Sequence, residues 1–215
     1  MDRGGSRTVT ILRRIKRTSL GHWAWNAYQP AIARPEENRF DLLDEHGKVI
    51  GEVTYGKMGL RKGAEVTTPW GPAKIEWPKL KVRILLNDEE LVRLDMTLLG
   101  RKADFVFKDG IVMQFNQIKG SRVDIQYSDG NGFVSFEEEN GTLPEGHAEL
   151  RVQMTKEEIK RLPKGERPRS IETRDYVQYR ITTQGALPVE RDDVIAALTI
   201  FAGFMRLMDE SPSLV

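Results

Sequence analysis

The chain has 215 residues, of which 39% are hydrophobic and 30% are charged, and its net charge at pH 7 is +1. This length suits one large β domain or two small ones, and the balanced charge does not by itself indicate a nucleic-acid or membrane partner. The sequence contains no cysteine. That excludes disulfides, thiolate metal ligands and a cysteine nucleophile, and it agrees with a reducing compartment.

Residues 1–20 predict a basic N-terminal arm. Its positive charges, set against the single acid Asp2, are Arg3, Arg7, Arg13, Arg14, Lys16 and Arg17. Charge interrupts this stretch too often for the apolar core of a signal peptide, so we expect a cytoplasmic protein, which lies peripherally at the membrane if it binds lipid. With Trp23, Trp25 and Tyr28 close behind, the arm suits an anionic surface, either phosphoinositide headgroups or nucleic acid. The alternative is a solvated arm with an edge strand that lysine and arginine protect from aggregation.

Alternating apolar and polar residues predict antiparallel strands along most of the chain. In one example, Val92 and Leu94 point inward, while Arg93 and Asp95 point outward. Further alternating segments are 49–55, 82–86, 111–115, 123–127, 148–154 and 177–181.

Turn residues at 44–47, 87–90, 109–110 and 128–132 join these segments as hairpins, because Gly, Asn and Asp tolerate the positive φ of such turns. Gly71-Pro72 with Trp70 predicts a sharp corner. The hairpins and their flanking strands predict ten or more strands. A sheet of that length usually closes on itself or splits into a sandwich.

Two helices interrupt the strands. Residues 155–162 predict a short helix in which Thr155 is the N-cap and Glu158 completes a capping box. The second helix covers roughly 188–209, and its segment 194–205 has Thr199 as its one polar residue. A helix that is apolar on all sides is enclosed by protein or by lipid, and this apolar run is shorter than the ~20 residues of a membrane span. We therefore expect a helix buried within the sheet, in a barrel too wide to be filled by its own side chains.

The motif FDLLDEHGKVIGEV at 40–53 and the motif RDDVIAALTIFAGFMRLMDE at 191–210 support a family resemblance. Together they resemble the opening hairpin and the terminal hydrophobic helix of the superfamily of tubby-like, LURP-one-like and phospholipid-scramblase-like domains. The resemblance spans roughly 40–210. It implies an all-β fold, a closed antiparallel barrel of about twelve strands around a buried hydrophobic C-terminal α-helix. We expect a single domain over 1–215, with the arm at 1–20, the barrel at roughly 21–185 and the central helix at roughly 188–209.

The candidate ligand-binding residues, for an anionic surface, are Arg13, Arg14, Lys16 and Arg17. The resemblance implies phosphoinositide binding through basic side chains on the barrel wall. A second basic set alternates with glutamates, which favours an exposed helix and loop with weak ion pairs. Its members are Lys156, Lys160, Arg161, Lys164, Arg167 and Arg169.

No metal and no cofactor is expected. His22, His46 and His147 are scattered and lack the spacing of metal ligands. Scramblase-like relatives hold calcium beside their helix, so the acidic residues Asp192 and Asp193 leave a calcium role open. The simpler explanation is that carboxylates stabilise the positive end of the helix.

The function expected from the sequence is a non-enzymatic binding or scaffold domain that recognises anionic phospholipid or phosphoinositide. Another protein is the alternative partner, and nucleic acid is not expected. The chain carries no Gly-rich phosphate loop, nucleophile elbow or dinucleotide fingerprint. The alternative function is a hydrolase-like enzyme with a site at the barrel mouth. A carrier of a small apolar ligand is a third possibility, although a helix along the axis leaves little room for one.

Overall fold

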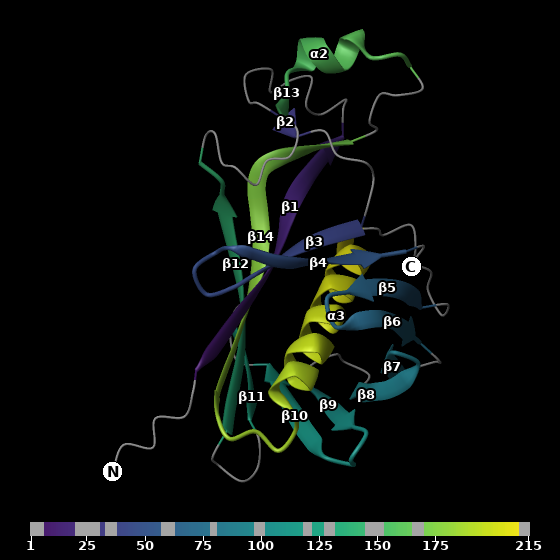
Figure 1. Cartoon of the computed structure of the whole chain (residues 1–215), viewed down its shortest axis with the longest axis vertical. Coiled ribbons are helices and arrows are strands. Elements are labelled where there is room, and N and C mark those ends of the chain that lie inside the picture. The colour runs from purple at the N-terminus through teal and green to yellow at the C-terminus, as the bar shows by residue number, and fades with distance from the viewer. Residues whose placement is uncertain are drawn as a thin grey trace. The chain divides into compact units, whose positions relative to one another are not determined.

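The structure is a computed structural model that describes residues 7–19, 31–32, 38–56, 63–77, 81–96, 102–117, 122–126, 132–144, 153–164 and 170–210. These residues are mainly β, with one large antiparallel sheet and a long C-terminal helix (Figure 1). The predicted all-β class and the predicted C-terminal helix are confirmed.

The described residues contain fourteen strands in one sheet. They are β1 (Thr8–Ser19), β2 (Ala31–Ile32), β3 (Asn38–Leu43), β4 (Val49–Tyr55), β5 (Ala64–Thr68), β6 (Gly71–Glu76), β7 (Lys81–Leu86), β8 (Glu89–Met96), β9 (Lys102–Phe107), β10 (Val112–Gln117), β11 (Arg122–Gln126), β12 (Gly132–Thr142), β13 (Gln153–Met154) and β14 (Ser170–Gly185).

Neighbouring strands follow chain order from β3 to β12, and each of these pairs is antiparallel. β1 lies beside β3, and β14 lies beside β12. β14 also pairs with β1 and with β2, and β2 pairs with β13. The sheet is therefore mostly a series of hairpins, as the alternating pattern predicts.

The chain divides into two compact units. The larger unit comprises Met1–Leu12, Asn38–Glu139 and Tyr179–Val215, and the smaller unit comprises Arg13–Glu37 and Asn140–Gln178. β1, β12 and β14 contribute residues to both units. This division does not test the expected single domain over 1–215, which stays a prediction.

The N-terminal basic segment differs from the predicted arm, because Thr8–Ser19 forms a strand of the sheet. Its first half carries buried apolar side chains: Val9 and Ile11 pack with Leu43 and the half-buried Val49. Burial of these side chains accounts for strand formation in a segment whose charge content predicts a solvated arm.

The turns at 44–47 and 109–110 lie where they are predicted, with Gly47 and Gly110 at φ of 80° and 78°. The β7–β8 connection is tighter than expected. Only Asn87 and Asp88 form it, both with positive φ (53° and 65°), as a type I′ turn requires. The corner at Trp70 joins β5 and β6 as a further hairpin. The predicted turn at 128–132 lies almost wholly outside the described residues, as does most of the strand predicted at 148–154.

The short helix α2 covers Lys156–Arg161 and has the predicted capping box. The Thr155 side chain accepts a hydrogen bond from the Glu158 main-chain N–H, and the Glu158 carboxylate accepts one from the Thr155 main-chain N–H. Two N–H groups that have no partner within the helix are satisfied in this way.

The long helix α3 covers Arg191–Glu210, and every side chain from Val194 to Ile200 is buried. The strands of the larger unit lie around it in Figure 1. Trp77 packs against Phe204 with ring centroids 5.6 Å apart, and Phe105 meets Phe201 edge-on at 5.8 Å. Among the described residues, no helix has both the length and the hydropathy to cross a membrane.

Candidate functional site

Arg13 on β1 contacts side chains of β14 within the smaller unit. Arg13 and Arg14 are only 8% and 5% exposed. The Arg13 Nε donates a 3.4 Å hydrogen bond to Gln178 Oε1, and the Arg13 guanidinium lies 4.9 Å from the centroid of the Tyr176 ring. A guanidinium at that distance over an aromatic face makes a cation–π contact, so Arg13 has a structural role in this unit.

The other two candidates on β1 are Lys16, which is less enclosed, and Arg17, whose side chain is not among those that the structure describes. Lys16 is half-buried, and its main-chain oxygen accepts a hydrogen bond from Thr173 Oγ1. The side chain of Arg17 and the aromatic residues Trp23, Trp25 and Tyr28 lie outside the described residues. The structure therefore brings Arg13, Arg14 and Lys16 onto one strand, with the two arginines covered.

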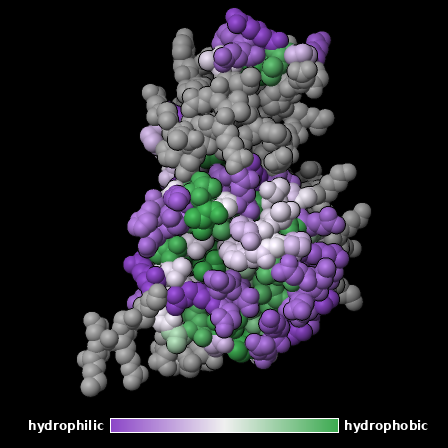
Figure 2. Space-filling model, in the orientation of Figure 1, coloured by the Kyte–Doolittle hydropathy of each residue, from purple (hydrophilic) through white to green (hydrophobic). Residues whose placement is uncertain are grey.

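The second basic set is more exposed. On α2 the Ile159 side chain is buried, while Lys160 and Arg161 are exposed, and Lys164 follows them as an exposed residue. Figure 2 shows α2 mainly in hydrophilic colours. The side chain of Lys156, and all of Arg167 and Arg169, lie outside the description.

Charge is distributed unevenly between the two units. The smaller unit contains thirteen lysines and arginines against nine acidic residues, a net charge of +4. The larger unit contains twenty against twenty-three, a net charge of −3. The overall charge of +1 hides this separation, which makes the smaller unit the more favourable one for an anionic partner.

The outward side of β6, β7 and β8 carries ion pairs. Arg83 Nε lies 2.7 Å from Glu90 Oε2, and Arg83 Nη1 lies 3.3 Å from Glu76 Oε2. Lys81 and Arg93 both approach Asp95, at 3.7 Å each. The acids beside these cations offset their charge, so this face lacks the uncompensated positive charge that an anionic surface needs.

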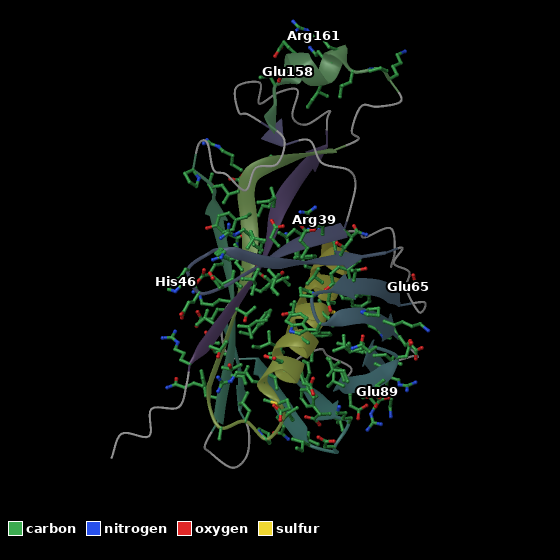
Figure 3. The ribbon with its side chains drawn as sticks, in the orientation of Figure 1. Arg39, His46, Glu65, Glu89, Glu158 and Arg161 are labelled. Carbon is green, nitrogen blue, oxygen red and sulfur yellow. The ribbon has the colours of Figure 1, made fainter. Side chains whose placement is uncertain are left out.

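A partly buried charge cluster lies on β3 and β4. Arg39, labelled in Figure 3, forms a hydrogen-bonded ion pair with Glu52, and its Nη2 lies 3.6 Å from Asp41 Oδ1. Asp41 and Glu52 are directly opposite each other in the register, and Asp41 is buried. One guanidinium thus separates two carboxylates that would otherwise repel each other.

A depression of about 410 Å³ lies over β4, β5, β6 and the β7–β8 turn. Its lining residues are Thr54, Gly56, Glu65, Val66, Thr67, Pro72, Ala73, Lys74 and Asp88. No local sequence pattern indicates this site, because its residues come together only when the register between strands is set. Thr54 lies opposite Thr67, and Glu65 lies opposite Lys74.

Within the described residues, no three histidine, aspartate or glutamate side chains are close enough to hold a metal ion. His46 is exposed in a turn, while His22 and His147 lie outside the description. Asp192 and Asp193 lie in the first turn of α3. The neighbouring Arg191 donates hydrogen bonds to Thr8 Oγ1 at 2.9 Å and to the Gly185 main-chain oxygen at 3.2 Å, which ties the start of the helix to β1 and β14.

The residues in these clusters belong to hairpins that alternating sequence predicts, but their grouping depends on register between strands. Comparison of the chain with protein-family models, curated proteins and solved structures finds no match.

Proposed function

We propose that this chain is a non-enzymatic binding or scaffold domain that meets its ligand on its outer surface. The observation that carries the proposal is the occupancy of the larger unit's interior by α3. Side chains from β4 and β9, together with Trp77, contact Ile200, Phe201 and Phe204 of this helix. Side chains fill the interior at these contacts, so a ligand is better placed outside.

The proposal includes a closed barrel of the tubby-like, LURP-one-like and scramblase-like type. The pairing order supports closure, because β14 neighbours β12 at one end of the hairpin series and pairs with β1 at the other. Nuclear Overhauser effects between main-chain protons of β1 and β14, in the same sample as those between β1 and β3, are the measurement that tests closure. Contacts on only one side of β1 would contradict it.

The proposed ligand is anionic phospholipid or phosphoinositide, contacted by the smaller unit. The net charge of +4 on this unit supports the assignment, and so do the exposed Lys160, Arg161 and Lys164. On β1, Arg13 and Arg14 are buried, whereas Lys16 is only half-buried and is therefore the more accessible of the three to a lipid headgroup. Basic residues near an anionic membrane contribute about 1 kcal/mol each, and salt screens this attraction.

The test is co-sedimentation of the full chain with vesicles of phosphatidylcholine alone or with added phosphatidylinositol bisphosphate. We expect binding only with the anionic lipid and weakening as salt rises. The double variant Lys160→Glu with Lys164→Glu should weaken binding at least tenfold, as about 1 kcal/mol per lysine implies. The control Lys48→Glu with Lys108→Glu makes the same charge change at exposed positions of the larger unit and should have little effect. Wild-type protein that ignores the anionic vesicles at low salt would refute the lipid assignment.

A hydrolase-like enzyme is the second candidate, and Asp41 opposite Glu52 is the observation that favours it. Two carboxylates on neighbouring strands are the groups that a glycosidase uses. Arg39 contacts both of them, however, which supports a structural role. Hydrolysis of chromogenic glycosides or esters by the wild type, abolished in Glu52→Gln with an unchanged thermal midpoint, would favour the enzyme.

A further inference from the structure

The depression over β4, β5 and β6 is a second potential binding surface, in the larger unit. Its volume of about 410 Å³ lies within the range of small-ligand sites. Glu65, Thr67 and Lys74 on its walls are exposed, while Val66 and Ala73 are buried beneath. Figure 3 labels Glu65 on β5, and Glu89 just after the β7–β8 turn.

The lining offers more acceptors than donors. Glu65 and Asp88 contribute two carboxylates, and within the described residues neither has an ion pair or a side-chain hydrogen bond. Lys74 is the one cation among the residues that line the depression, and its Nζ lies 3.0 Å from Glu76 Oε1, outside the lining. The hydroxyls of Thr54 and Thr67 lie on paired residues of β4 and β5.

The backbone of both acidic residues is held in place. The Gly56 main-chain N–H donates a 2.8 Å hydrogen bond to the Glu65 main-chain oxygen, which holds the end of β4 against β5. Gly56 also adds no side chain to the depression. Asp88 lies in a two-residue turn with φ of 65°, a conformation that leaves the backbone little freedom. The acceptors are therefore presented around the depression by strand and turn backbone rather than by long loops.

We propose that this depression binds a protonated organic amine, presented either by a free polyamine or by a lysine side chain of a partner protein. The ammonium group donates hydrogen bonds to the carboxylates of Glu65 and Asp88, and the hydroxyl of Thr54 or Thr67 accepts a hydrogen bond from the third N–H group. The net charge of −3 on the larger unit favours a cation over an anion. This site and its ligand are separate from the lipid surface of the smaller unit.

Isothermal titration calorimetry at low ionic strength tests the proposal with two probes. The first is spermidine, and the second is a short lysine-containing peptide compared with its acetyl-lysine counterpart. Glu65→Gln and Asp88→Asn should each weaken binding about three- to fivefold, the range for an exposed charge pair. Glu89→Gln, which neutralises an exposed carboxylate outside the lining, is the matched control and should not change the affinity. Lys74→Met should strengthen binding, because it removes the one positive charge of the lining, which repels a cationic ligand.

Binding of spermidine identifies a free amine as ligand, and binding of the peptide but not its acetylated form identifies a partner protein; either result supports the site. The proposal is overturned if neither probe binds the wild type, if Glu65→Gln and Asp88→Asn bind as well as the wild type, or if Lys74→Met binds more weakly. Liposome binding depends on lysines of the other unit, so failure here leaves the lipid assignment untouched, and the reverse also holds.

Discussion

Tyr55 on β4 donates a 2.7 Å hydrogen bond from its hydroxyl to the main-chain oxygen of Ile200 in α3. The same ring meets Phe40 edge-on at a centroid distance of 5.7 Å. Gly203 lies against this ring: a Cβ added there would be 2.8 Å from the Tyr55 Cζ and closer still to its hydroxyl oxygen. One buried tyrosine thus sets how closely α3 approaches the sheet.

Gly203→Ala should destabilise the protein. In an exposed helix this change normally stabilises by about 0.5–1 kcal/mol, because glycine loses more backbone entropy than alanine. Here the added methyl group overlaps a buried ring, and overpacking costs about 1–3 kcal/mol. Urea unfolding monitored by circular dichroism measures the free energy of unfolding.

Tyr55→Phe tests whether contact with the Tyr55 side chain is what destabilises Gly203→Ala. Alone it removes one buried hydrogen bond, which costs about 0.5–1.5 kcal/mol. Combined with Gly203→Ala it should destabilise less than the two single changes together, because the nearest clashing atom is gone. Additive effects would mean that the two residues do not limit each other's position.

The β7–β8 turn predicts a stabilising substitution. Asn87 and Asp88 both have positive φ, and glycine is favoured at the second position of a type I′ turn. Asp88→Gly should raise the thermal midpoint by a few degrees, while Asn87→Val should lower it, because a β-branched residue is strained at this φ. Differential scanning calorimetry measures the thermal midpoint of both variants, and a lower midpoint for Asp88→Gly would contradict the turn type.

Local patterns predicted much of the fold. Alternation marked strands such as β4, β7 and β8, and Thr155 with Glu158 marked the start of α2. The burial of Arg13 could not be predicted, because its partners Tyr176 and Gln178 are more than 160 residues away in sequence. A run of basic residues predicts a solvated segment, because the sequence does not show which distant aromatic and amide groups will cover it. The depression was missed for the same reason, since Glu65 and Asp88 come together only through strand pairing.

The capping box predicts a pH-dependent helix. Hydrogen bonds from the main-chain N–H and the side chain of Thr155 lower the pKa of the Glu158 carboxyl group. A lowered pKa means that the ionised carboxylate stabilises α2 above the carboxyl's ordinary pKa, and that this is lost as the pH falls through the lowered value. Thr155→Val should return the pKa of Glu158 towards its ordinary range, as a ¹³C-detected NMR titration would show. Thr142→Val serves as the control and should leave this titration unchanged.

In the charge cluster on β3 and β4, removing the positive charge of Arg39 should strongly lower the free energy of unfolding. Arg39→Leu removes the guanidinium that contacts both the buried Asp41 and Glu52. Removing one partner from a buried ion pair costs about 3–5 kcal/mol, and adding Asp41→Leu should recover much of it, because no buried carboxylate remains at that position. Urea unfolding of the single and double variants measures both changes in the free energy of unfolding. A single variant within 1 kcal/mol of the wild type would mean that Arg39 does not neutralise this cluster.

The proposed function depends on α3 being an enclosed core element, because an enclosed helix leaves the outer surface for ligands. Native-state amide hydrogen exchange, resolved by residue, measures this enclosure. We expect the main-chain amides of Ile200 and Phe204 to exchange only through global unfolding, with the slowest rates in the chain, and the amides of α2 to exchange through local opening. Exchange in α3 as fast as in α2, with strands β7 and β8 still protected, would contradict the claim.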